Sequence, residues 1–210
     1  MRNQEKSDLR RQLRKTRGQM PAHQRRIATQ KINRLLKRYI KKHQKIGIYW
    51  PMGKELRLDN FFQTALMRGA ELYLPYIEPG KKRLWFTRYS NNTAQKPERI
   101  RGTAKLQIPQ FSGKKIRVHQ LQLLLVPIVG IDRQGYRLGQ AGGFYDVSLA
   151  AMKHRTQAKT LGVGFHCQLI DQLPREAHDI ALNGFVSEKE ILHFTQTNYC
   201  HNVVPAQNNN

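Results

Sequence analysis

The sequence has little cysteine. Cys167 and Cys200 are the two in 210 residues, and they form neither a CxxC pair nor a zinc-finger spacing. A disulfide framework and a zinc knuckle are therefore not indicated, and we expect Cys167 to be buried. Long apolar runs are also missing, since none approaches the roughly 20 residues of a membrane-spanning helix. The basic N-terminus lacks the apolar segment of a secretory signal, so we expect a cytoplasmic protein with no membrane contact.

Acidic residues are scarce as well. The chain has 14 Asp and Glu against 37 Lys and Arg, which gives a net charge of +23. Residues 1–45 hold 16 basic residues against only Glu5 and Asp8, so this segment alone carries +14. Such an excess favours polyanionic partners, which include nucleotides, polyglutamate tails and nucleic acids. A solvated basic helix face is the simpler alternative, and charge alone does not decide between them.

The length suits a single α/β domain over residues 1–200, followed by a tail, 201–210, that we expect to be disordered. Helical and strand patterns alternate, which predicts a mostly parallel central sheet flanked by helices, with basic helices at the N-terminus. Ligands then gather at the carboxyl ends of the strands. We expect helices over 4–17, 21–43, 59–68 and from 147 to about 159, with Gly18 ending the first helix, Pro21 in the first turn of the second and Asp59 as a cap. We expect strands over 45–50, 71–74, 82–88 (nearer an edge), 121–129 (central), 160–165 and 184–186. Between them we expect a loop region with short structured pieces over 90–120, a turn at 132–135 and a capped helical turn at 187–190.

A glycine-rich segment, 137–146, follows the apolar run 121–129 and precedes the predicted helix. Glycines between a strand and a helix let the backbone approach phosphate oxygens, and the helix N-terminus offers free N–H donors. Asp146 adds a carboxylate that suits Mg²⁺. The spacing matches neither GxxxxGK[ST] nor GxGxxG, so by itself it is more typical of a structural turn. Asp146 is equally suited to capping a helix that starts at Val147.

The longer run from Val126 to Gly139, continuing through Phe144-Tyr145-Asp146, resembles the signature of the 5-formyltetrahydrofolate cyclo-ligases, also called 5,10-methenyltetrahydrofolate synthetases. Other segments agree in order: 6–10 resembles the family's K-x-x-L-R, 49–55 its folate pocket, 173–179 its late acidic motif and 186–188 its closing strand. The resemblance covers residues 5 to 192. It implies conversion of 5-formyltetrahydrofolate to 5,10-methenyltetrahydrofolate, with ATP as co-substrate and Mg²⁺ as cofactor. We expect the protein to be a monomer. ADP and phosphate are released through a phosphorylated formyl intermediate, and the folate substrate can carry a polyglutamate tail.

The resemblance also implies roles for particular residues. It assigns Arg137 and Tyr145 to catalysis and Asp146 and Asp179 to the metal. It assigns the folate to Trp50, Met52, Glu55 and Tyr145. It assigns ATP to two segments, Lys6, Ser7, Asp8, Leu9 and Arg10, and Arg137, Leu138, Gly139, Gln140, Ala141, Gly142, Gly143, Phe144 and Tyr145.

Each of these residues also has a plain structural interpretation. Lys6, Arg10 and Arg137 suit an exposed basic surface, Asp179 suits a turn, and Glu55 suits a helix start. Trp50, Met52 and Tyr145 suit an apolar core.

Three positions depart from the family pattern. Ala141 stands where glycine is usual, Val147 where arginine is frequent and Asn183 where aspartate is common. They leave open a lower activity, or a degenerate relative that binds folate or nucleotide without turnover. A basic nucleic-acid-binding protein is the other alternative, although the sequence has no helix-turn-helix, RNA-binding sheet motif or zinc finger.

Overall fold

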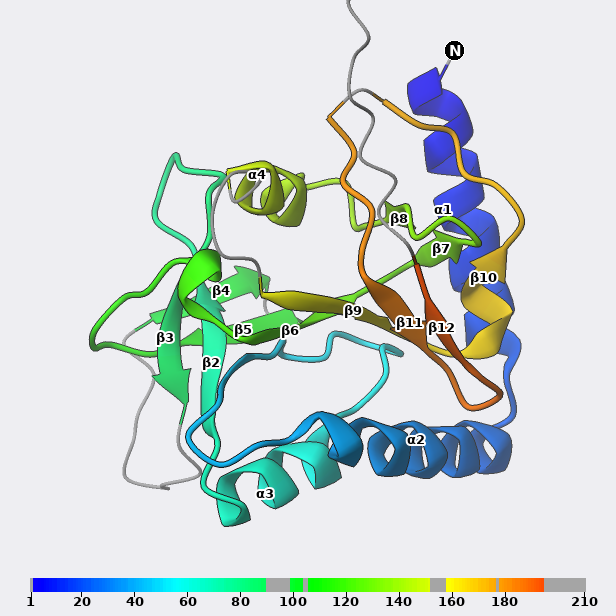
Figure 1. Ribbon diagram of the computed structural model, residues 1–210. Helices are drawn as coiled ribbons and strands as arrows, with labels where there is room; N and C mark the ends of the chain where they lie inside the picture. Colours follow the sequence, from blue (N-terminus) through cyan, green and yellow to red (C-terminus); the bar gives the residue numbers. More distant parts are fainter. Residues whose placement is uncertain (1, 90–98, 104–105, 152–157, 177, 195–210) are drawn as a thin grey trace, which may run out of the picture.

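A central sheet with helices on both faces organises the molecule (Figure 1). The computed structural model describes residues 2–89, 99–103, 106–151, 158–176 and 178–194. The helices are α1 (Arg2–Gln19), α2 (Ala22–Leu36), α3 (Asp59–Met67) and α4 (Phe144–Ala150), with 3-10 turns at Lys37–Tyr39, Val118–Gln120 and His166–Gln168. The strands are β1 (Lys45–Gly47), β2 (Glu71–Tyr76), β3 (Trp85–Tyr89), β4 (Arg99–Thr103), β5 (Leu106–Gln110), β6 (Leu123–Pro127), β7 (Gly130–Asp132), β8 (Arg137–Leu138), β9 (Lys159–Val163), β10 (Leu169–Ile170), β11 (Gly184–Val186) and β12 (Ile191–His193).

The main sheet has the strand order β12-β11-β9-β6-β1-β2-β3. The inner strands β11, β9, β6, β1 and β2 are parallel, whereas the edge strands β12 and β3 are antiparallel to their neighbours. The predicted α/β class, the central position of the 121–129 run and the edge position of the 82–88 run are therefore confirmed. The leucine run of β6 is buried because helices cover both faces of the sheet.

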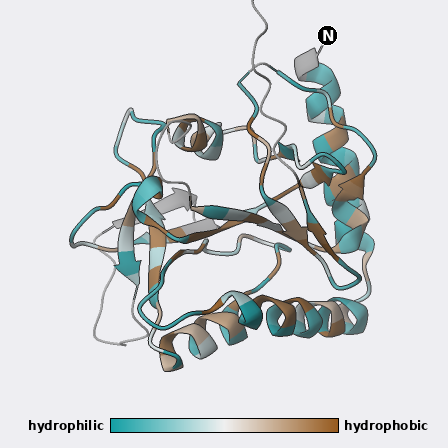
Figure 2. Ribbon diagram, in the orientation of Figure 1, coloured by the Kyte–Doolittle hydropathy of each residue, from teal (hydrophilic) through white to brown (hydrophobic). Residues whose placement is uncertain are grey.

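An apolar layer covers each face of the main sheet. On one face, α2 and α3 place Ile32, Leu36 and Phe61 against strand residues such as Leu72 and Leu125. On the other, Leu149 of α4 belongs to a cluster with Phe86, Leu124 and Phe185. Helix α1 is largely hydrophilic (Figure 2) and lies at one side, where Leu9 and Leu13 pack on Val129, Leu138 and Leu173. None of the described helices is long and apolar enough to cross a lipid bilayer.

The N-terminal helices differ from their predicted bounds. Helix α1 continues through Gly18 to Gln19, because a single glycine near a helix end costs only about 1 kcal/mol. Pro21 is the residue before α2, not part of its first turn, and α2 ends at Leu36, not at residue 43. Asp59 is the first residue of α3, and Leu58 is the cap.

The glycine-rich segment is built differently from the predicted direct strand-to-helix turn. A short hairpin of β7 and β8 lies between β6 and the loop, and the turn at 132–135 connects its two strands. Helix α4 begins at Phe144 after Gly143 in a left-handed conformation, so Asp146 lies in the first turn and does not cap the helix. The helix ends at Ala150, well before residue 159. Residues 152–157 lie outside the described residues.

The short structured pieces expected in the loop region 90–120 include the antiparallel pair β4 and β5. Other segments differ from their predictions. The predicted helical turn at 187–190 is a tight turn between β11 and β12, in which the Ser187 hydroxyl accepts from the N–H groups of Lys189 and Glu190. Cys167 is half-buried, not buried. Cys200 and the tail 201–210 lie outside the described residues.

Candidate active site

The candidate site lies where three neighbouring parallel strands end. The segments that follow β1, β6 and β9 leave the sheet at the same edge, because these strands are adjacent and parallel. Helix α1 runs beside them and carries Lys6, Arg10, Arg14 and Arg17 at spacings of three or four residues. Such spacings place side chains on one helix face. The basic N-terminal helix thus faces the glycine-rich loop.

The N-terminal end of α1 contacts the late acidic motif. The Lys6 ammonium, which is buried, lies 3.0 Å from Asp179 Oδ2 and 3.3 Å from Glu176 Oε2. One turn later, Arg10 Nε donates to the carbonyl of Gly139 at 2.9 Å. Burial lowers the pKa of Arg10, and the charges of Glu176 and Asp179 oppose that shift. Segments far apart in the sequence therefore meet at this end of the site.

Arg137 contacts Asp146 and the backbone next to Asp179, the two residues predicted for the metal. Its guanidinium donates to Asp146 Oδ1 at 2.7 Å and to the carbonyl of Ile180, the residue after Asp179, at 3.1 Å. Burial lowers the pKa of Arg137, and the nearby Asp146 and Asp179 charges act against it. The interpretation of Arg137 as an exposed surface residue is wrong, since the side chain is buried in the site.

The glycine-rich loop adopts a conformation that its alanine disfavours. Ala141 has φ of 77°, in the left-handed region where a side chain costs roughly 1–2 kcal/mol. Gly143, with φ of 66°, takes the same region without that cost. The loop thus keeps a glycine-type backbone at Ala141, and the departure from the family pattern is accommodated with local strain.

Glu55 links the segment predicted to bind folate, residues 49–55, to this loop. The carboxylate is buried, and its Oε2 accepts from the Met52 N–H at 3.0 Å. Its Oε1 accepts from the side-chain amide of Gln140 at 2.8 Å. Arg14 in turn donates to the Gln140 side-chain oxygen. The predicted nucleotide loop and the predicted pterin carboxylate are therefore direct neighbours.

Tyr145 presents a buried hydroxyl to the same place. The ring is half-buried, while the hydroxyl oxygen is inaccessible to solvent and has no hydrogen-bond partner among the described residues. Burial raises the pKa of this phenol, the Glu55 charge adds to the rise, and Arg137 opposes it. The phenol therefore stays protonated at neutral pH and is available as a donor.

Four residues of the site were not predicted from the sequence. Glu176 shares the Lys6 ammonium with Asp179, and Arg14 contacts Gln140. Tyr49 is buried with its hydroxyl on the Leu56 carbonyl at 2.7 Å, and Arg17 is buried near Glu55. The signal for Arg14 and Arg17 was present, because both continue the helical spacing that begins at Lys6 and Arg10.

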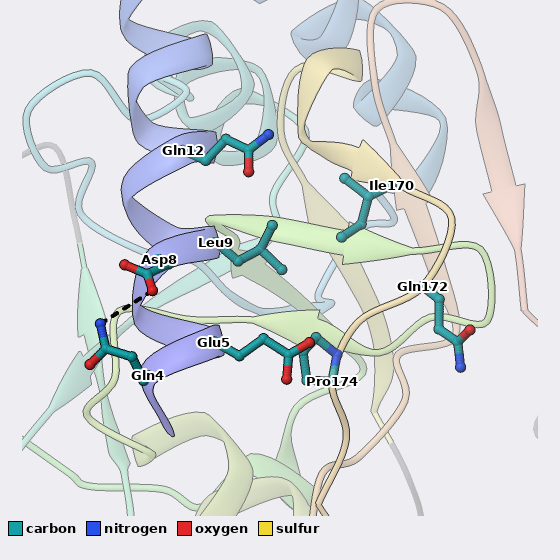
Figure 3. A pocket seen from close by; sticks show the side chains of 8 residues that line it. All are labelled: Gln4, Glu5, Asp8, Leu9, Gln12, Ile170, Gln172 and Pro174. Carbon is teal, nitrogen blue, oxygen red and sulfur yellow. Dashed lines mark hydrogen bonds between the residues drawn. The ribbon is translucent and has the colours of Figure 1, made fainter. Parts of the chain in front are cut away.

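Some predicted residues point elsewhere. Ser7 is exposed, Asp8 pairs with Arg11 at 2.8 Å, and Leu9 packs in the core. Asp8 and Leu9 line a groove of about 850 Å³ on the other side of α1, together with Ile170 and Pro174 (Figure 3). This groove contains none of the charged residues of the site. Within the segment 6–10, Arg10 therefore contacts the loop and Lys6 contacts the late acidic motif.

The aromatic and altered positions have defined surroundings. Trp50 is half-buried and packs edge-on against Tyr89, with ring centroids 6.5 Å apart. Val147 is an exposed residue of α4. Asn183 accepts from the Thr160 N–H and hydroxyl at 2.8 Å each, so it joins two chain segments.

The donor set fits a hard divalent cation. Asp146, which contacts Arg137, and Asp179, which precedes the Arg137-bonded Ile180, offer carboxylate oxygens, the ligand type that Mg²⁺ prefers. Glu176, His178 and Asp179 also form a group whose ligand atoms lie within 4.8 Å of one another. Asp146 and Asp179 are paired with Arg137 and Lys6, cations that a metal-bound triphosphate would also attract.

Comparisons with known proteins identify the family and the fold of this chain. A sequence model of the 5-formyltetrahydrofolate cyclo-ligase family matches residues 2–188. The 5-formyltetrahydrofolate cyclo-ligase of Haemophilus influenzae is 28% identical over 186 residues, which are 87% of this chain and 97% of the relative. The NMR structure of Aquifex aeolicus 5,10-methenyltetrahydrofolate synthetase matches with a TM-score of 0.70 and 26% identity, covering 93% of this chain and 98% of that one.

The 5,10-methenyltetrahydrofolate synthetase of Mycoplasma pneumoniae shares the fold, with a TM-score of 0.68 and 21% identity over 87% of this chain and 98% of its own. The family match extends over the α1 cations, Glu55, the glycine-rich loop and the late acidic motif. From this match the chain belongs to the 5-formyltetrahydrofolate cyclo-ligase family.

Proposed function

We propose that this protein uses ATP and Mg²⁺ to convert 5-formyltetrahydrofolate to 5,10-methenyltetrahydrofolate, ADP and phosphate. Family membership supports the reaction. The observation that carries the proposal is the hydrogen bond from Gln140 to Glu55, which joins the nucleotide loop to the pterin pocket. A phosphoryl transfer from ATP to the folate needs these two sites to be neighbours.

The chemistry explains why ATP is needed. A formamide oxygen is a poor leaving group, so the formyl oxygen first attacks the γ-phosphorus of ATP, and ADP leaves. The product is an iminium phosphate on N5 of the folate. The N10 amine then attacks the activated carbon, the C–O bond breaks, and phosphate departs while N10 loses its proton. No side-chain nucleophile takes part, so the protein acts by positioning and by offsetting charge.

The phosphates are assigned to cations and to the loop backbone. Arg10 contacts the Gly139 carbonyl, Lys6 contacts Asp179 and Arg137 contacts Asp146, and these three cations would offset the charge of the triphosphate. The N–H groups of the loop and of the first turn of α4 add donors. Asp146 and Asp179 would hold Mg²⁺, which neutralises phosphate charge in the transfer.

The folate is assigned to Glu55 and its surroundings. A carboxylate suits the amino and N3–H donors of the pterin ring, because two parallel N–H groups meet two oxygens. Gln140 occupies Glu55 Oε1, so folate binding must displace this amide or share the oxygen with it. Trp50 and Met52 provide apolar surface nearby, and the Tyr145 hydroxyl is a donor for the formyl oxygen.

Two substitutions test the assignment together. We expect Glu55→Gln to raise the KM for 5-formyltetrahydrofolate by about 10- to 100-fold, because a charged hydrogen-bond partner is lost. We expect Asp146→Asn to raise the Mg²⁺ concentration needed for half-maximal rate and to leave folate affinity unchanged. Asp59→Asn, in an exposed carboxylate paired with Arg57, is the matched control. The proposal would be contradicted if Glu55→Gln and Asp146→Asn changed both the folate affinity and the Mg²⁺ requirement to the same extent.

A further inference from the structure

Arg17 is a buried cation without a partner. It lies in the last turn of α1, and only 7% of its surface is exposed. Its Nε is inaccessible to solvent and has no hydrogen-bond partner among the described residues. Burying a guanidinium without acceptors is unfavourable. Such groups are therefore retained mainly where a ligand supplies the missing acceptor.

The other three cations on this face of α1 are all satisfied. Lys6 pairs with Asp179, Arg10 donates to the Gly139 carbonyl, and Arg14 donates to Gln140. These three contacts hold α1 against the loop and the acidic motif. Arg17 makes no such contact, so it does not serve to attach the helix in the same way.

The surroundings of Arg17 are those of the pterin pocket. Burial lowers its pKa, and the largest opposing effect is the negative charge of Glu55. The backbone next to Arg17 contacts the same segment, because the Gly18 carbonyl accepts from Lys54 Nζ at 3.0 Å and Lys54 directly precedes Glu55. Arg17 thus stands beside the carboxylate that the proposed function assigns to the pterin, without being paired to it.

The pterin ring has a polar edge that fits this pair. Along that edge the 2-amino group and N3–H are donors, and the next substituent is the C4 carbonyl oxygen, an acceptor. Glu55 meets the two donors, and a guanidinium beside it meets the carbonyl. We infer that Arg17 is a substrate-binding residue that donates to the C4 carbonyl oxygen of the pterin ring. This inference rests on the proposed function.

The test is direct binding of 5-formyltetrahydrofolate, by calorimetry, to the full chain and to Arg17→Met and Arg17→Lys. Methionine keeps much of the apolar stem, and lysine keeps the charge with fewer donors. We expect the Kd to rise by about 10- to 100-fold in Arg17→Met and by less in Arg17→Lys, with the Kd for ATP unchanged. Arg11→Met is the control, because Arg11 is an exposed residue of the same helix that pairs only with Asp8 in the described structure.

A second ligand identifies the contact. We expect the same loss with 5-formyl-6-methyltetrahydropterin, which has the pterin ring and no glutamate. If Arg17→Met weakened binding of 5-formyltetrahydrofolate but not of the pterin compound, Arg17 would bind a glutamate carboxylate. That result would overturn the inference. An unchanged Kd for both ligands, or equal losses for folate and ATP with a lowered melting temperature, would also overturn it.

A wild-type chain that does not bind 5-formyltetrahydrofolate would contradict the proposed function itself. The inference about Arg17 would then be rejected together with that function. Binding by wild type with no effect at Arg17 rejects the inference alone.

Discussion

Ala141 shows how single residues shape the loop. Its left-handed backbone, with φ of 77°, is one that glycine adopts freely. We therefore expect Ala141→Gly to raise the free energy of unfolding by about 1 kcal/mol. Glycine relieves the backbone strain of the folded state, and the greater entropy of the unfolded chain offsets part of that gain. Urea unfolding monitored by tryptophan fluorescence measures this. Ala22→Gly, in the first turn of α2, should destabilise the protein, and a similar loss for Ala141→Gly would show that the alanine is unstrained.

The Tyr145 hydroxyl gives a second residue-scale prediction. It is buried without a partner, so Tyr145→Phe removes no hydrogen bond, and the melting temperature should stay unchanged. If the hydroxyl donates to the formyl oxygen, kcat should fall by about 100-fold. Steady-state kinetics check this against Tyr73→Phe, whose hydroxyl bonds Glu71 at 2.8 Å on β2. A Tyr145→Phe enzyme with full kcat would assign the ring to packing alone.

The contacts among the site residues were harder to predict from the sequence than the residues themselves. The sequence indicated Lys6, Arg10, Arg137 and the two aspartates, and the structure brings them together. It did not indicate that Lys6 pairs with Asp179 or that Gln140 reaches Glu55. Those contacts depend on how distant segments meet, which local spacing does not encode. Arg17 was missed because an unpartnered side chain leaves no mark in the sequence beyond its helical position.

At the scale of elements, Asp132 links the hairpin β7–β8 to the late acidic motif. Its carboxylate, fully buried, accepts from the N–H groups of Gln134 and Tyr136 at 2.9 Å each. It also accepts from the Leu173 N–H at 3.3 Å and pairs with Arg175 at 3.0 Å. One carboxylate thus connects the strand that leads to Arg137 with the segment that carries Asp179.

This role predicts a large loss of stability. Asp132→Ala leaves several donors and the Arg175 charge without an acceptor, and we expect the free energy of unfolding to fall by about 3–5 kcal/mol. Asp171→Ala removes the exposed ion pair with Arg133 and should cost less than about 1 kcal/mol. Chemical denaturation of both variants makes the comparison. If both variants lost an equally small free energy of unfolding, contacts other than those of Asp132 would connect the β7–β8 hairpin to the late acidic motif.

Elements were predictable where periodicity was strong. The buried run of β6 and the short strand β11 were found in place, since apolar residues there reflect burial on both sides of the sheet. The hairpin of β7 and β8 was not predicted, because its strands are three and two residues long and carry no alternating pattern. The end of α2 was overestimated, because Tyr39 and Ile40 continue the apolar pattern while the chain turns through a 3-10 segment.

At the scale of the whole molecule, the charge of +23 should govern encounter with anionic substrates. Folate and ATP are both anions, and screening over about 10 Å at 0.1 M salt weakens long-range attraction. We expect kcat/KM for 5-formyltetrahydrofolate to fall by about tenfold between about 0.02 M and about 0.5 M salt, with kcat nearly unchanged. Initial rates in KCl measure it. A flat kcat/KM would mean that the excess charge serves something other than substrate attraction.

The central claim is that this fold joins an ATP site to a folate site for phosphoryl transfer. The most direct measurement mixes the purified protein with 5-formyltetrahydrofolate, ATP and Mg²⁺ and follows the near-ultraviolet absorbance of the methenyl product together with ADP. The account predicts one ADP for each product molecule, and no product when any of the three is omitted. Product formed without ATP, or no product while folate and ATP both bind, would contradict it.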